Sequence, residues 1–132
     1  MAADLIPADI REVWEQVLPG LTHVKTKTKA RWRPEDVYVS CVVGTAYLYL
    51  GEPGFVIVQP KEDPFTGERE LLVWIAYSNA QGSVATFQAA VDALALDHGF
   101  TKLTMWSNRP GWERVPGWEA VSMVYERRLT RE

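Results

Sequence analysis

The chain has 132 residues, 47% hydrophobic and 23% charged, which is the composition of a folded domain and excludes a disordered chain. Its length suits one domain over residues 1–132 and is short for two. The net charge is −3, and residues 25–33 carry five basic side chains and no acid, which leaves −8 on the rest; on this balance we expect no nucleic-acid partner.

Two helices are predicted in the first third of the chain. Apolar residues recur at helical spacing from Ile10 to Leu18, and Leu18-Pro19-Gly20 is expected to end that helix. A second helix is expected to begin around Pro34, where proline and two acids suit a first turn, and to end near Gly44. The β-branched residues between them also permit a strand.

Basic residues alternate between the two predicted helices. If this segment is extended, one face carries all five: Lys25, Lys27, Lys29, Arg31 and Arg33. One interpretation is a phosphate or nucleic-acid contact, with Trp32 available for stacking. The other, which we favour, is a mobile loop or an edge strand that lysines protect from aggregation.

Strand signals dominate the middle of the chain. Turns rich in glycine and proline separate the predicted strands Ala46–Leu50, Phe55–Gln59 and Leu71–Tyr77, and the third is apolar on both faces, as a central strand should be. Ser83 is a plausible N-cap for a further helix that Gly99 would end.

The last third of the chain completes a mixed sheet. The strand Lys102–Ser107 makes a βαβ-like unit with the preceding strand and helix, which implies a parallel pair. A short helical turn at residues 110–114 and a final strand, Val121–Leu129, are expected after it. The predicted fold class is therefore α/β, an α+β mixed sheet flanked by helices in the order ααβββαβ(α)β.

The sequence also bears on compartment and metals. Cys41 is the single cysteine, so no intrachain disulfide is expected, and no apolar run approaches the roughly 20 residues of a membrane helix. The first seven residues lack the basic start of a signal peptide. His23 and His98 have no partners at metal-ligand spacing, so no metal site is expected. We predict a cytoplasmic protein without a membrane partner.

The order of elements and several residues resemble the GNAT superfamily of N-acetyltransferases, in particular degenerate members of the kind found in phage and prophage. The family's central strand leads to a loop Gln/Arg-x-x-Gly-x-Gly/Ala and a long helix, and here Asn79-Ala80-Gln81-Gly82-Ser83-Val84 follows the third predicted strand. Asn108 ends the next strand, and residues 113–118 stand where a short helix commonly ends. Of the loop motif only Gly82 survives.

The resemblance implies acetyl-CoA as cofactor and an unknown amine as acceptor. The implied cofactor-binding residues are three at the end of the central strand, four in the loop and one after the next strand: Ile75, Ala76, Tyr77, Gln81, Gly82, Ser83, Val84 and Asn108. A helix N-terminus suits a pyrophosphate, although an ordinary strand-to-helix turn would have the same glycine and serine.

The sequence does not identify the catalytic residues. Glu70 and Glu113 are candidate bases, and Tyr77 and Tyr125 are candidate acids. The tyrosine that the family often uses as acid aligns with Glu113, or with Trp112 in the neighbouring register. The alternative to an enzyme is a non-catalytic structural or protein-binding component with a protein partner, and a homo-oligomer is compatible with either function.

Overall fold

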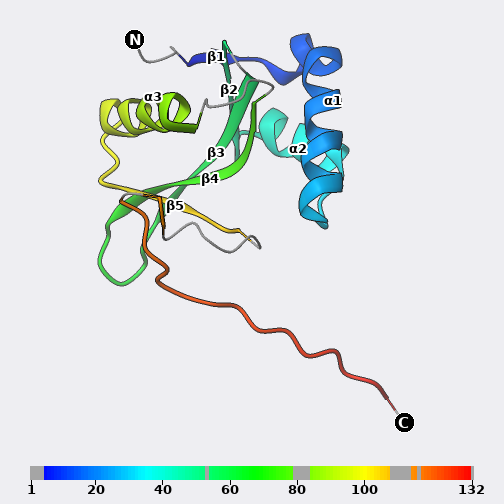
Figure 1. Ribbon diagram of the computed structural model, residues 1–132, viewed down its shortest axis with the longest axis vertical. Helices are drawn as coiled ribbons and strands as arrows, with labels where there is room; N and C mark the ends of the chain where they lie inside the picture. The colour runs from blue at the N-terminus through cyan, green and yellow to red at the C-terminus, as the bar shows by residue number, and fades with distance from the viewer. Residues whose placement is uncertain (1–4, 53, 79–83, 108–113, 116, 132) are drawn as a thin grey trace.

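Five strands and three helices make up the described part of the chain (Figure 1). The computed structural model describes residues 5–52, 54–78, 84–107, 114–115 and 117–131. The elements in order are β1 Ile6–Ala8, α1 Ile10–Thr28, α2 Pro34–Val43, β2 Tyr47–Gly51, β3 Gly54–Glu62, β4 Arg69–Ser78, α3 Val84–Asp97 and β5 Lys102–Met105.

The strands form one mixed sheet whose spatial order follows the chain, β1-β2-β3-β4-β5. The pairs from β1 to β4 are antiparallel, and β4 and β5 are parallel. Helices α1 and α2 cover one face of this sheet and α3 the other (Figure 1). The predicted fold class and the parallel β4–α3–β5 unit are thus confirmed, whereas the three-residue β1 was not foreseen.

Each face of the sheet has its own apolar core. On the α1 side the buried cluster is Ile10, Val17, Leu21, Val37, Ala46, Leu48, Phe55, Ile57 and Ile75. On the α3 side it is Val56, Val58, Leu71, Phe87, Val91, Ala95 and Phe100. Because successive residues of a strand point to opposite faces, β3 supplies both clusters from four consecutive buried residues, 55–58.

Helix α1 continues past the point where the sequence predicts its end. Asp9 caps it, accepting a hydrogen bond at Oδ1 from the backbone N–H of Arg11 at 3.0 Å, and Lys29 ends it in a left-handed conformation. The predicted stop at Pro19 is therefore wrong. Val17 and Leu21, both fully buried, flank the proline, and their packing outweighs the backbone hydrogen bond that proline cannot make.

Because α1 is longer than predicted, the first part of the basic segment, residues 25–28, is helical. Lys25 and Lys27 are helical, so the interpretation as an extended segment or edge strand is wrong. Lys25 Nζ donates to the carbonyl oxygens of Ala30 at 2.8 Å and Trp32 at 2.7 Å, which satisfies backbone acceptors just beyond the helix C-terminus. The other four basic side chains are exposed.

Helix α2 forms where predicted, and the strand alternative is not realised. Pro34 stands in its first turn, and the backbone N–H of Arg33 donates to Asp36 Oδ2 at 2.8 Å, which caps the N-terminus. Gly44 adopts φ 86°, a conformation that favours glycine, and ends the helix.

The predicted final strand does not form. Residues 117–131 contain no strand, and residues 119–131 are exposed throughout and run away from the sheet (Figure 1). A strand gains its stability from a neighbour that pairs its backbone, and in the described part of the chain this segment has none. The turn predicted at residues 110–114 lies almost wholly outside the described residues.

Candidate functional site

The parallel pair at the sheet edge separates halfway along β4. The β3–β4 register runs Ile57 to Ile75 and then Val58 to Val73, which leaves Trp74 as the extra residue of a β-bulge. The β4–β5 pairing covers Glu70 to Val73 and stops just before that bulge. From Trp74 to Tyr77, β3 is therefore the sole partner strand among the described residues.

The bulge also changes which side chains face α1. Trp74 and Ile75 are consecutive, yet both belong to the cluster on the α1 side. Trp74 packs edge-on against Trp32 of the α1–α2 connection, with ring centroids 6.3 Å apart. This edge-to-face contact ties the bulge in β4 to the α1–α2 connection.

The three strand residues of the predicted site lie in this half of β4. Ile75 is 2% exposed and anchors the strand in the core, Ala76 is exposed, and Tyr77 is half-buried on the α1 side. From Trp74 to Tyr77, the backbone N–H and C=O groups of β4 on the side of β5 have no partner strand among the described residues. Such an edge can pair with an extended chain that carries amide groups.

The loop residues of the predicted site cannot be placed. Gln81, Gly82, Ser83 and Asn108 lie outside the described residues, and Val84 is the first residue of α3. Chain length still limits the geometry, because residues 79–83 bridge at most about 20 Å from the end of β4 to the start of α3. The start of α3 is thus tethered within about 20 Å of the end of β4.

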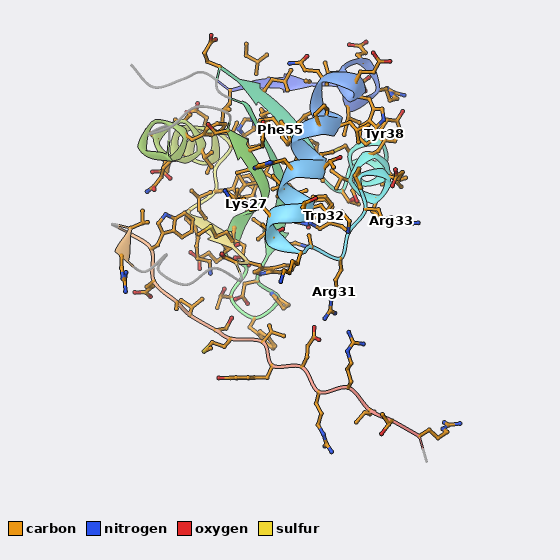
Figure 2. All side chains as sticks on the ribbon, turned by 45° about the vertical axis from the view of Figure 1, so that its right-hand side comes forward. Lys27, Arg31, Trp32, Arg33, Tyr38 and Phe55 are labelled. Atoms are coloured by element: carbon orange, nitrogen blue, oxygen red, sulfur yellow. The ribbon has the colours of Figure 1, made fainter. Side chains whose placement is uncertain are left out.

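An aromatic cluster joins the end of β4 to α1. The Tyr77 ring stacks on Phe55 at 5.5 Å, and the ring of His23 meets Tyr77 edge-on at 5.7 Å. Gly20 lets the helix approach this closely, because a Cβ there would stand 2.6 Å from the Phe55 ring. Figure 2 shows Phe55 of the sheet beside α1.

From the sequence, His23 was considered only as a possible metal ligand, and its position beside Tyr77 was not predicted. With the first helix expected to end at Gly20, no spacing rule could bring His23 to the sheet. The available signal was helical periodicity: Gly20 and His23 are three residues apart and lie on neighbouring positions of one helix face. That signal counts only once α1 is known to continue through Pro19.

The candidate acid and base residues are not brought together. Glu70 stands near the start of β4, seven residues and about 20 Å from Tyr77, too far to act on the same atoms. Tyr125 is 83% exposed in the C-terminal segment. Glu113 and Trp112 lie outside the described residues. Of the candidates that the structure describes, Tyr77 alone stands in the half of β4 beyond the bulge.

A depression of about 190 Å³ lies toward the opposite edge of the sheet from β4. Its lining comes from β1, β2, α1 and α2 and includes Arg11, Cys41 and Tyr47. Burial raises the pKa of the Cys41 thiol to about 11, so the thiol stays protonated at neutral pH and is a poor nucleophile. Cys41 therefore does not supply this depression with an activated nucleophile.

The described residues hold no cluster of three or more histidine, cysteine or acidic side chains that could bind a metal ion. None of the described helices combines the length and apolar character needed to cross a membrane.

No protein-family model and no curated protein matches the sequence. Solved structures do match the fold. A ribosomal-protein-alanine N-acetyltransferase from Brucella melitensis biovar Abortus is 20% identical with a TM-score of 0.67, covering 96% of this chain and 99% of its own. A GNAT family acetyltransferase from Staphylococcus aureus is 8% identical with a TM-score of 0.66, covering 98% and 100%. The BH1408 protein of Bacillus halodurans, in a mutant form, is 9% identical with a TM-score of 0.73, covering 96% and 99%.

These likenesses extend over nearly the whole length of both chains in each comparison. At such low identities they establish the fold and leave substrate open. The chain has the fold of the GNAT acetyltransferases, as the resemblance in its sequence implied.

Proposed function

We propose that this protein binds acetyl-CoA and transfers the acetyl group to an amine. The observation that carries the proposal is the separation of β4 from β5 at Trp74, in a chain with the GNAT acetyltransferase fold. The separation leaves backbone groups of residues 75–77 on an edge that an extended, amide-bearing ligand can pair with. The pantetheine arm of CoA has that chemistry.

The phosphates of the ligand would bind at the start of α3. Backbone N–H groups and the helix dipole favour an anion there, and the chain from 79 to 83 keeps this helix end close to β4. Gln81, Gly82, Ser83 and Val84 are the residues we assign to this contact, with Asn108 as a further one. A glycine at position 82 would allow the backbone to approach a phosphate.

The acceptor amine would approach from the α1 side of Tyr77. The amine nitrogen bonds to the thioester carbonyl carbon, and the carbon–sulfur bond breaks. His23 takes the proton that the amine loses, and the Tyr77 hydroxyl supplies a proton to the departing thiolate. Backbone N–H groups of residues 75–77 would stabilise the charge that develops on the carbonyl oxygen. The 5.7 Å between the His23 and Tyr77 rings supports a shared role.

Thermal unfolding with and without acetyl-CoA tests binding. Ligand at a hundred times its dissociation constant adds about 2.7 kcal/mol, which raises the melting temperature of a domain of this size by several degrees. Adenosine 3′,5′-bisphosphate, which lacks the pantetheine arm, is the control for binding through the nucleotide alone. No shift at millimolar acetyl-CoA would refute the proposal.

Release of free CoA thiol in the presence of a panel of primary amines and N-terminal peptides then tests transfer. The proposal predicts amine-dependent release of thiol and an acetylated product of the expected mass. Binding without transfer to any amine would instead support the non-catalytic alternative, which no observation on the described residues favours.

A further inference from the structure

The second half of α1 runs beside the part of β4 that has separated from β5. Two ring contacts bracket this part of the strand. His23 of α1 meets Tyr77 at 5.7 Å, and Trp32, just beyond the helix, meets Trp74 at 6.3 Å. The chain between His23 and Trp32 therefore passes along residues 74–77 of β4. A side chain that α1 presents here stands where the acceptor amine is proposed to approach.

Lys27 is a cation that α1 presents on this side. It follows Gly20 by seven residues and His23 by four, so it shares their face of the helix. Gly20 defines the direction of that face, because a Cβ there would meet the Phe55 and Tyr77 rings. With a rise of about 1.5 Å per residue, Lys27 stands about 6 Å along the helix from His23. Its side chain is exposed and can reach a ligand.

The neighbouring basic side chains have partners, whereas the charge of Lys27 is not paired within the described part of the chain. Lys25 donates to two backbone carbonyl oxygens, and Arg31 and Arg33 each pair with a carboxylate. No ion pair between described residues involves Lys27 or Lys29. An unpaired cation beside a binding surface attracts a ligand that carries a carboxylate.

The distance between Lys27 and the reaction centre limits where that carboxylate stands in the acceptor. The reacting amine would lie beside His23 and Tyr77, one helical turn from Lys27. In a free amino acid a single carbon separates the amine from the carboxylate, which is too short to bridge one turn. An acidic side chain one or two residues after the N-terminus of a peptide does bridge it, because consecutive Cα atoms are about 3.8 Å apart.

We infer that the acceptor is a peptide whose N-terminal amine is followed, at the second or third position, by an acidic side chain that pairs with Lys27. The inference rests on the proposed acetyl transfer and names the class of acceptor for it. Because Lys27 is exposed, water and salt screen the pair. We therefore expect a preference of about fivefold for an acidic acceptor, the size typical of one exposed ion pair.

Acetyl transfer to three amidated tetrapeptides tests the inference: Ala-Glu-Glu-Ala, Ala-Gln-Gln-Ala and Ala-Lys-Lys-Ala. The wild type should show a kcat/KM about fivefold higher for the glutamate peptide than for the glutamine peptide, and a lower one for the lysine peptide. Lys27→Gln should reduce the first ratio to less than about twofold. The matched control Lys29→Gln removes the same charge at the end of α1, outside the face of Lys27, and should keep the wild-type ratio.

Three outcomes of this assay would overturn the inference and leave the proposed acetyl transfer standing. One is an equal kcat/KM of the wild type for the glutamate and glutamine peptides. Another is an equal loss of the preference in both variants, which would assign it to the field of the whole basic segment. The third is a preference that does not change between about 20 mM and 500 mM NaCl, since salt must weaken an exposed ion pair.

Direct binding decides the inference separately if none of the peptides is acetylated, the result that would refute the proposed function. The same peptides, labelled with fluorescein at their C-termini, are titrated with the protein in the presence of CoA, and fluorescence anisotropy gives their affinities. The glutamate peptide should bind about fivefold more tightly than the glutamine peptide, and Lys27→Gln should remove the difference. Equal affinities for the wild type would overturn the inference by this measurement as well.

Discussion

Gly20 determines how closely α1 approaches the end of β4. Its backbone passes over two stacked rings, and an added Cβ would stand 2.6 Å from Phe55 Cε2 and 2.9 Å from Tyr77 Cδ2. Both rings are held by their neighbours, so neither can move aside freely. The sequence contains this glycine but gives no hint of the contact, because the contact joins segments 35 and 57 residues apart.

Replacing Gly20 tests that close approach. Gly20→Ala should reduce the free energy of unfolding by about 1–3 kcal/mol, through displacement of Phe55 and Tyr77. Chemical denaturation measures this cost. The double variant Gly20→Ala/Phe55→Leu removes the ring that the new methyl group meets, so its cost should be smaller than the sum of the two single costs. Strict additivity would show that the contact does not limit α1.

His23 carries the proposed proton transfer. His23→Gln should lower kcat for acetyl transfer by about 10²–10⁴-fold, the range of general base catalysis. The shift in melting temperature with acetyl-CoA should remain at the wild-type size. His98→Gln is the matched control, since His98 is also exposed but stands beyond α3, with Nδ1 2.9 Å from the Leu94 carbonyl oxygen. Equal activity of the two variants would exclude His23 as the base.

Cys41 predicts a pH dependence of stability. Its folded-state pKa is raised from 9.0 to about 11 because burial disfavours the thiolate. The unfolded chain loses the thiol proton first, so the contribution of Cys41 to stability is complete below pH 9 and declines as the pH rises toward 11. The difference in unfolding free energy between wild type and Cys41→Ala should shrink over that range. A difference independent of pH would contradict the assigned burial.

At the scale of elements, the main error of sequence reasoning concerned α1. Proline followed by glycine is a sound stop signal on local grounds, because Pro19 cannot donate a backbone hydrogen bond. The helix continues because Val17 and Leu21 bury the same face on either side of the proline. Tertiary burial outweighs local propensity here, and burial cannot be read from a window of a few residues.

The second half of α1 is therefore predicted to stabilise the fold strongly. Leu21→Ala should cost about 2–5 kcal/mol in unfolding free energy, as expected for a fully buried leucine. Leu96→Ala, at a position 70% exposed on α3, should change it by no more than about 0.5 kcal/mol. If both variants lost the same small amount, α1 would not pack beyond Pro19 as described.

The bulge at Trp74 is the second feature that could not be predicted from the sequence. The run from Leu71 to Tyr77 is apolar on both faces, which correctly indicated a central strand. The same property hides the bulge, because a strand without alternation gives no register from which an extra residue could be detected. The separation from β5 at Val73, which defines the candidate site, was for that reason invisible.

At the scale of the whole molecule, the order of elements carried most of the prediction. Helix α3 and the strands beside it have strong local patterns, so the parallel β4–β5 unit and the mixed sheet followed from sequence. The predicted final strand, Val121–Leu129, was wrong, because the apolar pattern of these residues does not provide a neighbouring strand to pair with. Residues 75–77, which the sequence assigned to the site, stay a prediction, and His23 was not among the residues assigned.

Calorimetric titration of acetyl-CoA into the wild type and the Ala76→Trp variant tests the central claim most directly. Ala76 is exposed in the separated half of β4, so an indole there should block the ligand without disturbing the core. We predict saturable binding by the wild type, a loss of at least 100-fold in Ala76→Trp, and wild-type binding by the control Ala93→Trp on the exposed face of α3. Equal affinity in all three proteins would place the ligand elsewhere and contradict the account.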